Sequence, residues 1–132
     1  MDLTYLLKVF GATGGVMLAL DLVWLGVVAK GLYARELGSL LRPDVKWVPA
    51  LLFYTIYVIA VVAFVVLPAA ERKSLTYALG MGAFFGFAAY ATYDLTSLAL
   101  IRDFPLKIVI VDLAWGAVLT MVVSAAGYAV AR

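Results

Sequence analysis

The sequence contains no cysteine and no histidine. The absence of cysteine excludes disulfides, thiolate metal ligands and thiol nucleophiles. Without histidine, the chain lacks the side chain that titrates most readily near neutral pH and the commonest metal ligand in proteins. Charge is scarce as well, because charged residues make up 14% of the chain, against about 25% in soluble domains. Ten Lys or Arg against eight Asp or Glu is too even a balance for a nucleic-acid-binding protein.

Apolar residues, in contrast, account for 67% of the 132 residues, and the mean hydropathy is +1.10. Soluble domains contain about 45–50% apolar residues. A chain of this length has too little interior to remove so much apolar surface from water. We therefore expect an integral membrane protein with lipid as its solvent.

Four apolar stretches are long enough to cross a hydrocarbon core of about 30 Å. They cover residues 9–29, 47–67, 76–100 and 108–131. The connections are short, so consecutive spans should be antiparallel neighbours. We predict an all-α fold, in which residues 1–132 form a single four-helix transmembrane bundle with both termini on the same side.

The longest connection carries apolar residues at helical spacing beside charged ones over residues 31–42. This pattern predicts an amphipathic segment in the membrane interface. The first and third connections hold six Lys or Arg, against four on the side of the termini. The excess favours a cytoplasmic location for these two connections.

Three carboxylic acids, Asp21, Asp94 and Asp112, interrupt the first, third and fourth spans. An Asp at the centre of a membrane helix costs about 2.5–3.5 kcal/mol and normally faces the bundle interior or a watery cavity. With a rise of about 1.5 Å per residue, the three lie about 13, 12 and 7 Å from the nearest Lys or Arg at the same end of the bundle. We therefore expect the three carboxyl groups to converge on one site.

Small residues four positions apart predict close helix contacts in a membrane. This spacing occurs in the first span at Gly11 and Gly15, and in the third at Ala78, Gly82 and Gly86. A D-L-x-W pattern begins at two of the acids, Asp21 and Asp112, so an indole three residues later could donate its N–H to the site or form its wall. Besides the three acids, which would donate or accept protons, the predicted substrate-binding residues are Trp24, Tyr54, Tyr90, Tyr93, Trp115, Arg102 and Lys107. The phenols would supply hydrogen bonds, and Arg102 or Lys107 would anchor an anionic head group.

Three interpretations of the acidic cluster remain open. The acids could bond to Tyr, Trp or basic side chains and merely tie the helices together. They could act as general acids or proton carriers, or bind Mg²⁺ or Ca²⁺. The sequence has no close acidic pair typical of the metal site, no nucleophile motif and no cofactor fingerprint, so we expect neither a metal nor a cofactor.

Four motifs in order resemble the bacterial membrane-protein family known as domain of unknown function 2177. They are D-L-V-W-L-G at 21–26, P-A-L-L-F-Y at 49–54, A-Y-A-T-Y-D-L-T at 89–96, and P-L-K with V-D-L-A-W-G within 105–116. The resemblance implies a small four-helix protein of the bacterial inner membrane. The family's usual Y-D-L-T-N ends here in Ser97, which removes a side-chain amide from that position.

These observations favour a polar pocket that binds or modifies a membrane lipid or another amphiphile. Whether the protein is an enzyme stays open at this point. One alternative is a proton-linked transporter subunit, which would need a homo-oligomer because four helices make a narrow translocation unit. Another is a non-catalytic subunit of a membrane assembly.

Overall fold

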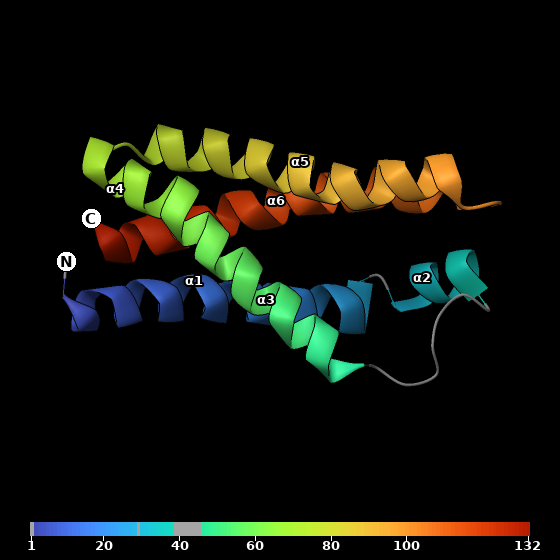
Figure 1. Cartoon of the computed structure of the whole chain (residues 1–132), viewed down its shortest axis with the longest axis horizontal. Coiled ribbons are helices and arrows are strands. Elements are labelled where there is room, and N and C mark those ends of the chain that lie inside the picture. Colours follow the sequence, from blue (N-terminus) through green and yellow to red (C-terminus); the bar gives the residue numbers. More distant parts are fainter. Residues whose placement is uncertain (1, 29, 39–45) are drawn as a thin grey trace.

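The computed structural model describes residues 2–28, 30–38 and 46–132, and within them it is all-helical (Figure 1). Two one-turn π-helices, η1 and η3, lie within the first two long helices. In chain order the elements are α1 (Leu3–Val23), η1 (Trp24–Val28), α2 (Lys30–Leu37), α3 (Trp47–Val61), η3 (Val62–Val66), α4 (Leu67–Arg72), α5 (Leu75–Leu100) and α6 (Leu106–Ala131).

Four helices are long and apolar enough to span a membrane, which confirms the predicted all-α, four-span architecture. They cover Leu3–Val27, Trp47–Glu71, Leu75–Leu100 and Leu106–Ala131. The first begins six residues earlier than expected, because the Asp2 side chain caps the helix by accepting a hydrogen bond from the Tyr5 N–H at 2.8 Å. The predicted end of this span at residue 29, and residues 39–42 of the amphipathic segment, lie outside the described residues.

The second span continues through Pro68, where the sequence predicted an end. Proline has no backbone N–H to donate to the preceding turn. Here Pro68 occupies the first turn of α4, directly after the π-turn η3, and a first-turn N–H needs no helical partner. The helix ends where Lys73 adopts a left-handed conformation with φ of 52°. The reversal between the second and third spans is therefore limited to Lys73 and Ser74.

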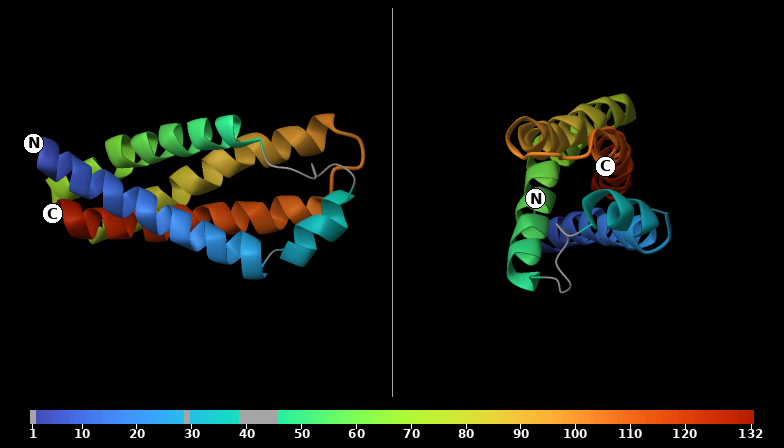
Figure 2. Two further views of the ribbon diagram at one scale, coloured as in Figure 1. Left: turned by 90° about the horizontal axis from the view of Figure 1, so that it is seen from below. Right: turned by 90° about the vertical axis from the view of Figure 1, so that its right-hand side faces the viewer.

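The helices form a bundle whose two ends differ (Figures 1 and 2). Helix α6 lies between α1 and α5, while the continuous rod of α3, η3 and α4 crosses them diagonally. Both termini and α4 lie at one end, which we call the terminal end, and α2 lies at the other, which we call the α2 end. The central core is built from fully buried apolar side chains of α1, α3, η3 and α6, including Val9, Met17, Val61, Val65, Val66, Leu119 and Val123.

Glycine allows α5 and α6 to approach each other closely. A Cβ atom on Gly86 would lie 2.0 Å from the Gly116 carbonyl oxygen, and one on Gly82 would lie 2.7 Å from the Ser124 hydroxyl. These contacts confirm the close packing predicted for the third span. They also fix how α5 packs along α6, and Asp94 and Asp112 lie further toward the α2 end of the same pair of helices.

The corresponding prediction for Gly11 and Gly15 is wrong within this chain. Both are exposed, and no described atom lies within 4 Å of a Cβ built on either. The face of α1 that is turned toward α6 carries Thr13 instead, and the small residue stands on the partner helix. A Cβ on Gly127 would lie 2.4 Å from the Thr13 hydroxyl.

Helix α2 packs against the α2 end of the bundle. Its Leu32, Tyr33 and Leu37 contact a buried cluster formed by Phe104 of the third connection together with Ile108 and Val109 of α6. The apolar face predicted for this segment thus covers the start of α6, and its hydroxyl-bearing member, Tyr33, is brought toward the acids.

Candidate functional site

All three acids lie toward the α2 end of the bundle, on three different helices. Asp21 is near the end of α1, Asp94 in the last two turns of α5 and Asp112 in the second turn of α6. Asp94 is fully buried, whereas Asp21 and Asp112 are partly buried. A chain of hydrogen bonds and one aromatic stack connects Asp21 with Asp112, and the Asp112 carboxyl group is the charged neighbour of Asp94.

Asp21 is held by two aromatic donors from other helices. The Tyr54 hydroxyl of α3 donates to one carboxylate oxygen at 2.5 Å, and the Trp115 indole N–H of α6 donates to the other at 3.3 Å. The Tyr54 hydroxyl also lies 3.3 Å from the Met17 carbonyl oxygen. Each carboxylate oxygen thus has a described partner, and the acid joins α1, α3 and α6.

Asp112 accepts a hydrogen bond from the hydroxyl of Tyr33, a residue that sequence reasoning did not single out. That hydroxyl in turn accepts from the Trp24 indole N–H at 3.4 Å. Burial and the neighbouring Asp112 carboxylate raise the pKa of Tyr33 above its ordinary value, so the phenol remains a proton donor. The signal in the sequence was its place among the apolar positions of the amphipathic segment.

The indoles of Trp24 and Trp115, one from each D-L-x-W motif, pack against each other. Trp24 and Trp115 stack with ring centroids 4.3 Å apart and planes 5° from parallel. Because α1 and α6 are antiparallel, the tryptophan that follows Asp21 lies level with Asp112, and the tryptophan that follows Asp112 lies level with Asp21. The Trp115 indole donates directly to Asp21, whereas the Trp24 indole reaches Asp112 through the Tyr33 hydroxyl, and the stack connects the two halves of the site.

Asp94 has no such donor. Its side chain is 0% exposed, and neither carboxylate oxygen has a hydrogen-bond partner among the described residues. The Asp112 carboxyl on α6 is its charged neighbour. An unpartnered buried carboxyl group costs more than a hydrogen-bonded one, so Asp94 is the least satisfied of the three acids.

A cavity of about 400 Å³ opens beside this pair, between α3, α5 and α6. Its walls are Phe53, Ala89, Tyr90 and Tyr93, and Asp112 supplies the carboxylate. The volume falls within the range of about 300–1,000 Å³ typical of small-ligand sites. Tyr93 and Phe53 are exposed at its edge, so a molecule in the surrounding lipid can reach Asp112 from the side.

The remaining predicted binding residues lie elsewhere. The Lys107 ammonium is 3.9 Å from the Glu36 carboxylate at the exposed α2 end, and Arg102 is exposed in the third connection. Trp24 and Trp115 contribute to a separate groove of about 340 Å³, which Ile110, Val111, Ala114 and Val118 complete. None of these four predicted residues is in the described lining of the Asp112 cavity.

The chemistry of the site is that of carboxyl and phenol groups. Within residues 2–28, 30–38 and 46–132, no group of three Asp, Glu, His or Cys is arranged to hold a metal ion. Asp21 accepts hydrogen bonds from Tyr54 and Trp115, and Asp112 accepts one from Tyr33. The arrangement can accept hydrogen bonds from a bound molecule and can exchange protons with it.

Comparisons with known proteins place the chain in a family. Neither the curated proteins nor the solved structures give a match. One family model, described as a predicted membrane protein, covers residues 6–129, which include all three acids and most of every span. The match shows that the chain, with its four apolar helices, belongs to the membrane-protein family DUF2177.

Proposed function

We propose that the protein binds an amphiphile whose polar group carries hydrogen-bond donors, such as the hydroxyl groups of a neutral lipid or an amine. The observation that carries the proposal is the lateral cavity with aromatic walls and the Asp112 carboxylate. An apolar chain would lie along Phe53 and Tyr93, which are exposed to the surrounding lipid. The polar group would reach Asp112 inside.

The polarity of the site favours a donor over an anion. Asp112 lines the cavity and has Asp94 as a charged neighbour, while the described lining contains no Lys or Arg. A phosphate or carboxylate head group would meet like charge there. We therefore no longer assign Lys107 or Arg102 the role of anchoring an anionic head group at this cavity.

Native mass spectrometry of the protein in phosphatidylcholine nanodiscs tests the proposal with three probes that carry the same type of monounsaturated hydrocarbon chain. Monooleoylglycerol and oleylamine should bind, whereas oleic acid should not. Asp112→Asn should weaken binding about tenfold, the effect of losing roughly 1.5 kcal/mol from a hydrogen bond to a charged group. The matched control is Asp103→Asn, which changes an exposed acid in the third connection. Equal binding of all three probes would contradict the proposal.

Proton-linked transport by a homo-oligomer is a second candidate, and one observation favours it. Asp94 is fully buried without a described hydrogen-bond partner, and intramembrane acids of this kind mark proton pathways. Proteoliposomes loaded with a pH-sensitive dye distinguish the candidates. Transport requires proton flux that Asp94→Asn abolishes, whereas simple amphiphile binding requires no flux.

The family and the four spans are consistent with a multi-pass membrane protein. We infer further that it resides in a bacterial inner membrane, with the first and third connections in the cytoplasm. The chain has no cysteine, so single cysteines at Arg102 and Ser74 can be labelled from one side. A membrane-impermeant maleimide applied to intact cells should modify the cysteine at Ser74 and leave the one at Arg102 unmodified. Labelling at Arg102 and not at Ser74 would show the opposite orientation in the membrane.

A further inference from the structure

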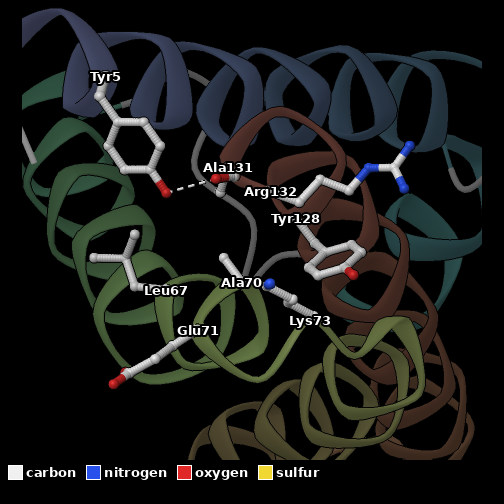
Figure 3. A pocket seen from close by; sticks show the side chains of 8 residues that line it. All are labelled: Tyr5, Leu67, Ala70, Glu71, Lys73, Tyr128, Ala131 and Arg132. Carbon is white, nitrogen blue, oxygen red and sulfur yellow. Dashed lines mark hydrogen bonds between the residues drawn. The ribbon is translucent and has the colours of Figure 1, made fainter.

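A second and larger cavity, of about 760 Å³, lies at the terminal end of the bundle (Figure 3). It forms where the start of α1, α4 and the end of α6 meet, far along the helices from the Asp112 cavity. Its lining residues are Tyr5, Leu67, Ala70, Glu71, Lys73, Tyr128, Ala131 and Arg132.

One wall carries Tyr128, a largely buried residue that lines the cavity. Tyr128 is only 7% exposed, and its ring packs against Ala69 and Ala78. Among the residues drawn in Figure 3, the Tyr5 hydroxyl donates a hydrogen bond to the Ala131 carbonyl oxygen at 2.7 Å. The Tyr128 hydroxyl has no partner in this set, although the residue is more than nine-tenths buried.

The charge of this cavity is opposite to that of the acidic site. Lys73 and Arg132 are basic, and the Lys73 ammonium lies beside Ala70 on the cavity side of the turn, whereas the Glu71 carboxylate points away (Figure 3). The ion pair recorded for the described residues joins Lys107 and Glu36 at the other end of the bundle. Lys73 and Arg132 thus have no described carboxylate partner.

We propose that this cavity binds the phosphate of an anionic membrane lipid, with the Lys73 ammonium and the Tyr128 hydroxyl as donors. The helix ends α4 and α6 place these groups at the membrane surface, where phosphates lie, and Leu67 and Ala70 offer an apolar wall for the start of the acyl chains. Charge-assisted hydrogen bonds to phosphate are stronger than neutral ones. The proposal is independent of the function proposed for the acidic site.

Thermal unfolding of the full chain in a neutral detergent, with added lipid, tests this site. Phosphatidylglycerol should raise the melting temperature at concentrations at which phosphatidylcholine does not. Tyr128→Phe removes only the hydroxyl, and Lys73→Asn removes the charge while tolerating the left-handed backbone of this position. Each should raise the phosphatidylglycerol concentration required about tenfold. The matched control is Lys107→Gln at the α2 end, which should leave it unchanged.

Three results would overturn the proposal. The first is equal stabilisation by phosphatidylcholine and phosphatidylglycerol. The second is an unchanged response in folded Tyr128→Phe and Lys73→Asn proteins, with folding checked by circular dichroism. The third is saturation by glycerol phosphate at concentrations as low as those of the lipid, which would identify a soluble anion as the ligand.

Discussion

The indole N–H of Trp115 lies 3.3 Å from the carboxylate of Asp21, although 94 positions separate the two residues in the chain. The same indole stacks on Trp24, whose N–H points to Tyr33 and, through it, to Asp112. A repeated D-L-x-W motif on antiparallel helices thus produces a reciprocal arrangement, in which each helix supplies the acid of one half of the site and the indole of the other.

Removing the indole N–H of Trp115 should weaken the contact with Asp21 while an aromatic ring stays in the stack. Trp115→Phe keeps an aromatic ring against Trp24 and removes the donor to Asp21. We expect the free energy of unfolding in mixed micelles to fall by about 0.6 kcal/mol, the average for hydrogen bonds between membrane helices. Trp47→Phe serves as the control, because Trp47 is 67% exposed at the start of α3. An equal effect of both substitutions would contradict the assigned contact.

The close approach of α5 and α6 predicts a contrast between two glycines of the same helix. Gly86→Ala would place a Cβ 2.0 Å from the Gly116 carbonyl oxygen, and such overpacking typically costs about 1–3 kcal/mol. Gly80 is exposed with no described atom within 4 Å, so Gly80→Ala should leave stability unchanged or raise it by up to about 1 kcal/mol. Unfolding free energies of the two variants test this, and similar values would refute the packing.

The phenol of Tyr33 should titrate at higher pH than an ordinary tyrosine. Burial and Asp112 raise its pKa above the usual value of about 10. The stabilisation linked to the neutral phenol is therefore complete below about pH 10 and is lost as the pH rises toward the pKa of the folded state. In near-ultraviolet absorbance titrations, the difference between wild type and Tyr33→Phe should show no phenolate forming near pH 10. A component at that pH would contradict the contact with Asp112.

Asp94 should be dispensable for stability and should influence binding through its neighbour Asp112. Its oxygens lack described hydrogen-bond partners, and Asp112 is its charged neighbour. Asp94→Asn keeps the side-chain volume and removes the charge, so it should unfold at the same or a higher free energy than wild type. It should weaken monooleoylglycerol binding, because the new amide can donate a hydrogen bond to Asp112 that competes with the ligand. The control is Thr96→Asn, at an exposed position two residues further along α5. A destabilised Asp94→Asn protein, or one with unchanged binding, would favour the tethering interpretation.

Much of the fold was predictable because lipid leaves few choices to an apolar chain. Four spans follow from hydropathy alone, and the helical rise was sufficient to place Asp21, Asp94 and Asp112 in the same half of the bundle. The contact of Gly82 and Gly86 with α6 also followed from their spacing. Local spacing could not show which small residues face a neighbour, so Gly11 and Gly15 were misassigned.

The features that were missed depend on tertiary contacts. Tyr33 joins the site only because α2 docks on Phe104 and Ile108, and no local pattern specifies that docking. The continuation through Pro68 depends on the π-turn before it. The direction of each indole depends on the antiparallel pairing of α1 and α6, which a motif within one helix does not reveal.

Photo-crosslinking with a diazirine-bearing oleyl alcohol tests the central claim, that the Asp112 cavity holds an amphiphile, most directly. The probe is added to the protein in phosphatidylcholine nanodiscs, irradiated, and located by peptide mapping. We expect labelling to concentrate on Phe53, Ala89 and Tyr93, to be competed by unlabelled oleyl alcohol, and to fall about tenfold in Asp112→Asn. Labelling spread evenly over the lipid-facing helices, with no response to competitor or to Asp112→Asn, would contradict the account.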